Sequence, residues 1–159
     1  MTMDRQRPLA HTLVAAVVVL AVASAACDVG ANGSAADADP LATVAQGSGA
    51  EALISGTLEI TPSCVLLDEQ DELVLLVWPA DRTVWDPTND SVVLTSHSGD
   101  VSGLTNGTEV VFSGGGSSTA EGGEPADAFI ASVQWEQAPA LECVHDTRWF
   151  IGDLVPSSG

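Results

Sequence analysis

The sequence predicts an all-β domain, built as a small antiparallel β-barrel or, alternatively, a β-sandwich. Three observations indicate this fold class: short apolar runs rich in β-branched residues, turn signals between those runs, and no segment with convincing helical periodicity. The chain has 159 residues, which suits one domain with appendages. Hydrophobic residues make up 45% of the chain, so the domain can bury a core.

The N-terminal segment has the order of a secretion signal. Arg5 and Arg7 precede an apolar run over residues 13–26, which only Ser24 interrupts. This run is shorter than the roughly 20 apolar residues that a membrane-spanning helix needs. Small residues end it, as at a cleavage site. We therefore expect residues 1–26 to be a signal peptide and the mature chain to be extracytoplasmic.

Two processing routes fit the end of this signal. Ala23-Ser24-Ala25 fits the A-x-A rule of ordinary signal peptidase, which would release a secreted protein. Ser24-Ala25-Ala26-Cys27 resembles the lipobox of bacterial lipoproteins, with Ser24 where that family usually has Leu. The resemblance implies that Cys27 becomes the first mature residue and carries the acyl chains. Two or more chains would anchor the protein to the cell membrane without a transmembrane helix.

The cysteine count bears on the same question. The chain has three cysteines, Cys27, Cys64 and Cys143, and an odd number leaves one unpaired. The economical assignment is a Cys64–Cys143 disulfide with Cys27 as the lipidation site. The alternative is a secreted protein in which Cys27 is free or bonded to another chain. A disulfide closing so long a loop would stabilise the domain by about 4.5 kcal/mol.

Residues 27–50 are expected to be the lipidated cysteine and a flexible linker, and residues 51–159 the β-domain. The linker is rich in Gly, Ala, Ser and Asp and has no aromatic residue, so it cannot bury enough surface to fold. Within the domain, seven runs predict strands: 54–60, 64–67, 73–78, 92–95, 109–112, 129–135 and 148–155. The glycine-rich residues 114–127 predict a mobile surface loop.

One of these segments resembles a known kind of barrel. Residues 104–114, LTNGTEVVFSG, are similar to the L-x-x-G-x-x-V-x-F-x-G segment of small OB-like barrels, in which a glycine turn leads into a strand. Residues 56–58, GTL, are similar to the first strand of such barrels. The resemblance implies an OB-like barrel rather than an immunoglobulin-like sandwich. Barrels of this kind bind oligosaccharides, oligonucleotides and proteins.

The charge of the chain narrows that choice of ligands. Its 22 acidic residues face only four basic ones, and the net charge is −18. Removal of residues 1–26 takes away Asp4, Arg5 and Arg7, which leaves −19. A nucleic-acid-binding surface needs clustered cations, so we expect no nucleic-acid partner. The partners that remain are the membrane, through the lipid anchor, and an envelope protein or glycan.

Few side chains stand out as functional. Trp85 lies in a segment, residues 82–87, that predicts a loop, and an exposed Trp there could stack on a sugar or insert into a partner. The other tryptophans fall in strand-like runs and are expected in the core. His97 and His145 lack the spacing of a metal site. The acidic cluster Asp68, Glu69, Asp71 and Glu72 suits a solvated turn.

No catalytic or cofactor motif is present in the sequence. We therefore expect a non-catalytic cell-envelope lipoprotein that uses a small acidic β-domain to bind a protein or a glycan, with no metal and no cofactor. One alternative is a structural or stress-related envelope protein without a specific ligand. The other, expected least, is a secreted enzyme.

Overall fold

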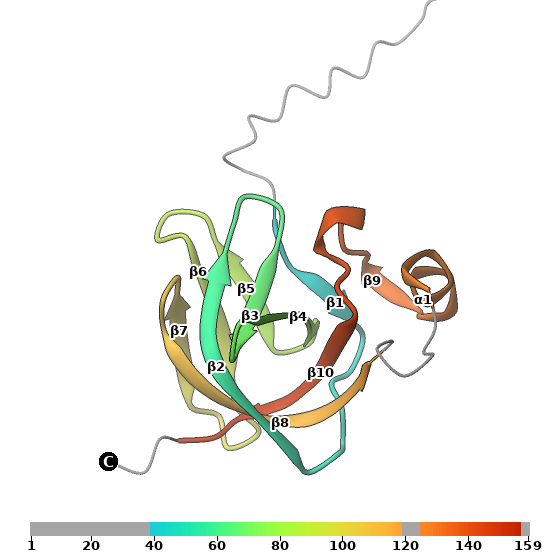
Figure 1. Ribbon diagram of the computed structural model, residues 1–159. Coiled ribbons are helices and arrows are strands. Elements are labelled where there is room, and N and C mark those ends of the chain that lie inside the picture. The colour runs from blue at the N-terminus through green and yellow to red at the C-terminus, as the bar shows by residue number, and fades with distance from the viewer. Residues whose placement is uncertain (1–38, 119–124, 157–159) are drawn as a thin grey trace, which may run out of the picture. The chain divides into compact units, whose positions relative to one another are not determined.

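The computed structural model describes residues 39–118 and 125–156. The expected signal peptide (1–26), the expected lipidation site Cys27 and linker residues 28–38 lie outside the described residues and stay predictions. No described helix is long and apolar enough to cross a membrane. The elements, shown in Figure 1, are β1 (Ala42–Val44), β2 (Ala52–Ile60), β3 (Val65–Glu69), β4 (Glu72–Pro79), β5 (Thr83–Asp86), β6 (Ser91–Thr95), β7 (Val101–Thr105), β8 (Glu109–Ser118), α1 (Ala126–Ser132), β9 (Trp135–Gln137), the 3-10 helix η1 (Leu141–Cys143) and β10 (Thr147–Leu154).

Five strands close into a barrel, which confirms the predicted all-β class. The barrel runs in the order β2-β3-β4-β10-β8 and returns to β2 (Figure 1). All of these neighbours are antiparallel except β4 and β10, which are parallel. The predicted small antiparallel barrel is therefore present, with one parallel pair of neighbours, β4 and β10, where it closes. The long connection between β4 and β10 allows β10 to run in the same direction as β4.

The barrel interior is the main hydrophobic core. Trp78 is fully buried there and meets Phe112 edge-on, with ring centroids 5.5 Å apart. The continuous apolar run of β4 is buried along both of its faces, as the sequence predicted for residues 73–78. Its two faces serve two different cores, because alternate side chains of a strand point in opposite directions.

A separate three-stranded sheet, β5-β6-β7, completes the main core. Val92, Leu94 and Leu104 of this sheet belong to the same buried cluster as the barrel interior. Residues 83–86 form strand β5, so the loop expected around Trp85 is wrong. The sequence missed β7 as well, since only Leu104 of its five residues is buried and apolar periodicity therefore gives no signal.

The second core lies outside the barrel, over β3 and β4. Leu66, Leu75 and Val77 point outward and pack under β1 and the segment 125–146. We call β1 together with residues 125–146 the cover. Phe129 is the most buried residue of α1 and sits in this core. The barrel face formed by β3 and β4 is therefore occupied by the chain itself.

The cover corrects two predictions. Residues 42–44 were expected in the linker, but they form β1, which pairs in parallel with β4. Residues 129–135 were expected as a strand, but most of them belong to α1. Their alternation is real, yet Phe129, Ile130 and Val133 also fall on one helical face and pack together on the second core. This short segment fits the period of a strand and the period of a helix equally well, and its packing on the second core selects the helix.

The predicted disulfide is confirmed. Cys64, just before β3, is bonded to Cys143 at the end of η1, with the two Cα atoms 5.5 Å apart. Both cysteines are buried in the second core. The bond therefore fastens the cover to the barrel at a point between β2 and β3.

The glycine run of β8 corrects a further prediction. Residues 114–118 continue the strand and pair with β10, although they were expected to begin a loop. Trp149 lies against them: a Cβ on Gly114 or Gly116 would come within 2.7 or 2.6 Å of its ring atoms. Glycine is needed here because the indole crosses the strand at close range. Of the expected loop, residues 119–124 lie outside the described part of the chain.

Candidate functional site

A groove lies beside the edge strand β7. It has a volume of about 880 Å³ and runs between β7 and the outer side of β2 and β8. Its walls also include the turn between β3 and β4 and the end of β10. The lining residues are 55–57, Asp68, Gln70, Asp71, 102–104, 108–111 and 154–156.

The turn between β3 and β4 places carboxylates at this groove. Gln70 and Asp71 have positive φ values of 55° and 71°, and the Asp71 N–H donates to Asp68 Oδ1 over 3.0 Å. The side chain of Asp68 thus closes the turn while it stays exposed. The predicted polar turn is present, and it forms one wall of a groove that no sequence signal had indicated.

Gly56 allows β2 to approach this turn closely. A Cβ at position 56 would lie 2.2 Å from the carbonyl oxygen of Asp68, so only glycine fits without a backbone shift. The turn between β7 and β8 docks on the same strand, because the Gly107 N–H donates to the Leu58 carbonyl over 2.8 Å. These backbone contacts set the floor of the groove.

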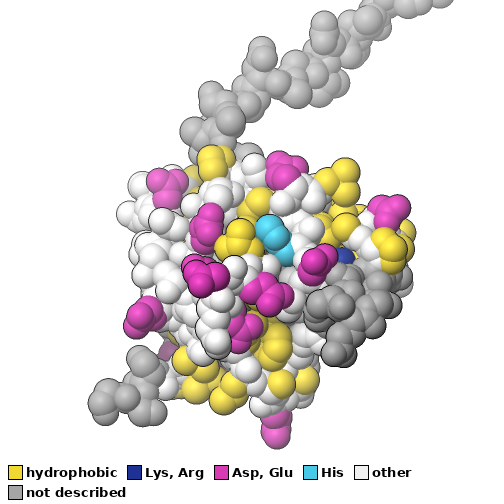
Figure 2. Space-filling model, in the orientation of Figure 1, with side chains coloured by type: hydrophobic (Ala, Val, Ile, Leu, Met, Phe, Trp, Pro, Cys, Tyr) yellow, Lys and Arg dark blue, Asp and Glu magenta, His cyan; other side chains and the backbone are white. Residues whose placement is uncertain are grey.

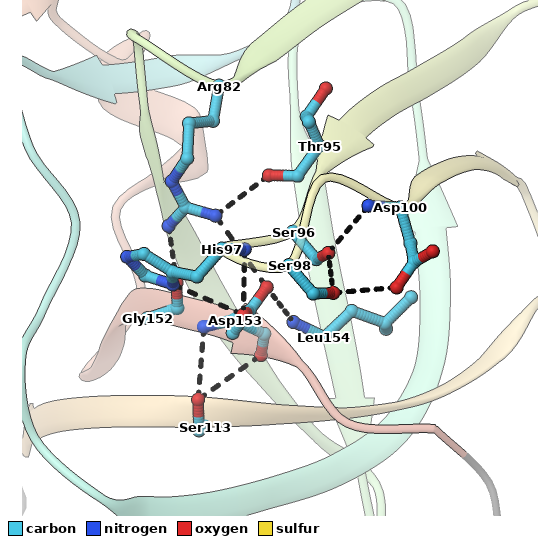
Figure 3. A network of polar contacts seen from close by, with 10 residues as sticks. All are labelled: Arg82, Thr95, Ser96, His97, Ser98, Asp100, Ser113, Gly152, Asp153 and Leu154. Carbon is cyan, nitrogen blue, oxygen red and sulfur yellow. Dashed lines mark hydrogen bonds and ion pairs between the residues drawn. The ribbon is translucent and has the colours of Figure 1, made fainter.

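A polar network fixes β5-β6-β7 against the barrel (Figure 3). Arg82 donates to the carbonyl oxygens of Thr95, over 2.8 Å, and of Gly152, and pairs with Asp153 at 3.6 Å. Asp153 Oδ2 lies 3.1 Å from both the backbone nitrogen and the ring Nδ1 of His97. Because Asp153 is followed directly by residues 154–156, the network also positions that wall of the groove.

The Asp153 carboxylate is held in its charged form. Partial burial raises its pKa, but hydrogen bonds from the His97 N–H, the His97 ring and the Leu154 N–H, with the nearby Arg82 charge, outweigh this effect. The pKa therefore lies below the ordinary value of an aspartate. The network supplies structure at neutral pH, where this carboxylate is ionised.

Ser113 joins the same network but does not extend it into a catalytic triad. Its hydroxyl accepts from the Asp153 N–H over 3.0 Å and contacts the Asp153 carbonyl, so it meets backbone and not the His97 ring. A triad needs the serine hydroxyl bonded to the histidine. In the described part of the chain, the hydrogen-bond partner of the His97 ring is Asp153.

Both arginines of residues 39–156 point inward. The side chain of Arg82 is 14% exposed, and Arg148 is 2% exposed with its guanidinium 4.3 Å from the centre of the Phe129 ring. Figure 2 shows Asp and Glu side chains distributed over the face that it presents, with hardly any Lys or Arg visible. Apart from histidine, the charge that the described surface offers to a partner is therefore negative.

The other residues singled out from the sequence lie elsewhere. Trp85 is half-buried in β5 and packs on the main core, with its indole nitrogen enclosed and without a hydrogen-bond partner among the described residues. His97 is tied to Asp153, and His145 precedes β10. No cluster of described His, Cys, Asp and Glu side chains could hold a metal ion.

Neither a family model nor a curated protein nor a solved structure matches the chain. The site must therefore be interpreted from its own geometry.

Proposed function

We propose that this protein is a non-catalytic lipoprotein of the cell envelope that binds a partner through the groove beside β7. In this proposal, acyl chains on Cys27 hold the protein at the membrane and the residues before β1 act as a tether. The acidic barrel is the binding domain. The observation that carries the proposal is an open groove whose charged lining groups are all carboxylates.

The size of the groove supports a binding role. Ligand sites are commonly clefts of about 300–1,000 Å³, and this one has about 880 Å³. Its lining mixes hydroxyl, amide and carboxylate groups with apolar side chains such as Leu104 and Val110. This mixture can both exclude water from a partner and bond to its polar groups.

The cover favours the groove as the binding site, rather than the barrel face at which OB-like barrels bind their ligands. OB-like barrels bind ligands on the face of their second and third strands. Here those strands are β3 and β4, and their outward side chains Leu66, Leu75 and Val77 are buried under the cover. A ligand could reach that face only by displacing the cover. The groove on the other side of the barrel needs no such movement.

The anchor is tested by the intact mass of the protein extracted from membranes. We expect a mature chain that begins at Cys27, carries acyl mass on that residue and stays in the membrane fraction. A Cys27→Ser variant serves as the control and should appear in the soluble fraction. An unacylated wild-type chain in the medium would contradict the anchor and favour the secreted alternative.

The binding role is tested by photo-cross-linking in living cells. A photo-reactive amino acid at Ser102, inside the groove, should form an adduct with one envelope partner. The same residue at Glu136, on the cover, is the matched control and should give no adduct. Absence of adducts from Ser102 and from a second groove position, Thr108, would contradict the binding role and favour the structural alternative.

A further inference from the structure

We propose that the groove takes an extended peptide segment rich in Lys or Arg, which adds a strand to the free edge of β7. The inference rests on the proposed function, because it names the class of partner for the same groove. It follows from three properties of β7 and its surroundings: an unpaired edge, a glycine that the fold does not require, and carboxylates without cations.

The edge of β7 that faces the groove has no strand beside it. The sheet order is β5-β6-β7, so β7 ends this sheet within residues 39–118 and 125–156. An edge strand presents unpaired backbone groups that can pair with another chain. Addition of a strand to such an edge is a common mode of peptide recognition.

The register identifies which backbone groups are available. Ser96 and Asp100 form a hydrogen-bonded pair, in which the Ser96 N–H donates to Asp100 over 2.8 Å. Bonded and non-bonded pairs alternate along antiparallel strands, and β7 pairs with β6 from Thr95↔Val101 to Ser91↔Thr105. Positions 101, 103 and 105 therefore direct their N–H and C=O groups away from β6.

At Thr105, these outward backbone groups already have partners. The Thr105 N–H donates to Thr108 Oγ1 over 3.2 Å, and the Thr105 carbonyl accepts from the Thr108 N–H over 3.1 Å. These bonds confirm that the N–H and C=O of Thr105 point away from β6. They also leave neither group free to pair with an added strand. Val101 and Gly103 then carry the backbone groups that an added strand would use.

Gly103, in the middle of β7, has no structural need to be glycine. A Cβ at this position would meet nothing within 4 Å, whereas a Cβ at Gly56 would collide with Asp68. The φ of Gly103 is not positive, so no turn requires it. Glycine inside a strand weakens the strand, so strand formation does not favour it here. Without a side chain, Gly103 leaves its outward N–H and C=O uncovered. An added strand would bond to these groups in the plane of the sheet, and the Cβ position would stay open.

The charge of the groove selects the kind of peptide. Asp68, Asp71 and Glu109 are among its lining residues, and no Lys, Arg or His is among those that the structure describes. Lys or Arg side chains on alternate positions of an added strand would meet these carboxylates. The described lining contains no aromatic ring either, so a sugar would lack the stacking surface that commonly holds it. These two features favour a basic peptide over a glycan.

The first test measures binding of a labelled peptide, acetyl-Lys-Val-Lys-Val-Lys-Val-amide, by fluorescence anisotropy with the full mature chain. We expect saturable binding that weakens as salt rises. Gly103→Pro removes the outward N–H and should weaken binding by about tenfold, the value of one lost hydrogen bond. Gly103→Ala is the matched control: it keeps the N–H and its Cβ has open space, so its affinity should stay within about twofold.

The second test does not depend on how β7 tolerates proline. Asp71→Asn with Glu109→Gln removes two charges from the groove, and Glu136→Gln with Glu142→Gln removes two from the cover. The groove pair should weaken peptide binding by about fivefold or more and flatten its salt dependence. The cover pair should change the affinity by less than about twofold.

The outcomes separate this inference from the proposed function. Equal affinities for Gly103→Pro and Gly103→Ala, or equal effects of the two charge pairs, would overturn the strand-addition proposal. If the photo-reactive group at Ser102 still captured a partner in cells, the binding role would stand with a different ligand, such as a glycan. Without that adduct, the binding role itself would fail.

Discussion

The two sides of the barrel differ in what lies against them. The β3–β4 side is apolar and is sealed by the cover, the second core and the Cys64–Cys143 disulfide. The β2–β8 side beside β7 is polar, open and lined by carboxylates. The apolar face stabilises the fold because its burial removes apolar surface from contact with water. The open groove contributes little to stability, and its polar side chains stay accessible to a partner.

The means of attachment differ in the same way. Apolar packing and a covalent bond hold the cover on one side. On the other side, the network of Arg82, His97 and Asp153 ties β5-β6-β7 to β10 through hydrogen bonds and an ion pair. Changes to the first set should therefore lower stability most, and changes to the second should lower it less and in a way that depends on pH.

The largest effect is expected from loss of the disulfide. Cys64→Ser with Cys143→Ser should lower the free energy of unfolding by about 4.5 kcal/mol, because the bond no longer restricts the unfolded chain. Chemical denaturation measures this change. Hydrogen exchange should rise in α1 and η1 well before it rises in β7. Reductant added to this double variant should have no further effect, and an unchanged denaturation midpoint would contradict the assigned role of the bond.

The next effect is expected at the centre of the cover. Phe129 meets Trp135 and Phe150 edge-on, with centroids 5.6 and 6.2 Å away. Phe129→Ala should cost about 3 kcal/mol, since it leaves a cavity and removes these ring contacts. Phe129→Leu, which keeps most of the volume, should cost less than half of this. Neither variant should alter peptide binding in the groove, and a parallel loss of binding would show that the two sides are coupled.

The smallest effect is expected at the network. Asp153→Asn should lower stability at pH 7 by about 1 kcal/mol, because a partly buried, charge-assisted contact is lost. The pKa of Asp153 is lowered in the folded protein, so its contribution is present above the unfolded pKa of about 3.9 and is lost as pH falls through the folded value.

The measurement is the difference in Tm between wild type and Asp153→Asn from pH 7 to pH 2. This difference should be largest at neutral pH and should vanish at the acid end. Comparison with the variant is necessary, because protonation of the other surface carboxylates also relieves repulsion in an acidic chain. If the Tm difference stayed constant over the whole pH range, the lower stability of Asp153→Asn would come from altered packing or hydrogen bonding and not from the lost charge.

Much of the barrel was predictable from local pattern. The runs that became the barrel strands β2, β3, β4, β8 and β10 combine β-branched residues with turn signals, as does the run that became β6 of the three-stranded sheet. Cysteine counting identified the disulfide. Residues 129–135 show where local pattern fails, because so short a segment fits both the alternation of a strand and one face of a helix. Residues 42–44 show a second limit: nothing local marks them as a strand, and only the edge of β4 makes them one.

The groove was less predictable than the barrel. Asp68 and Asp71 stood out as an acidic turn, but Ser102, Gly103 and Thr108 carry no motif, and Trp85 proved to be half-buried. A groove arises where strands that are distant in the sequence do not pack closely against each other. No local sequence pattern predicts such a groove.

By itself, the sequence determined the strand-forming runs, the pairing of two cysteines and the negative charge, because each depends on residue type and near spacing. Only the tertiary structure decided that β10 closes the barrel parallel to β4, that the chain covers one of its own faces, and that β7 keeps a free edge. These features arise from contacts between residues far apart in the chain, where the free energy of burial and pairing outweighs local preference.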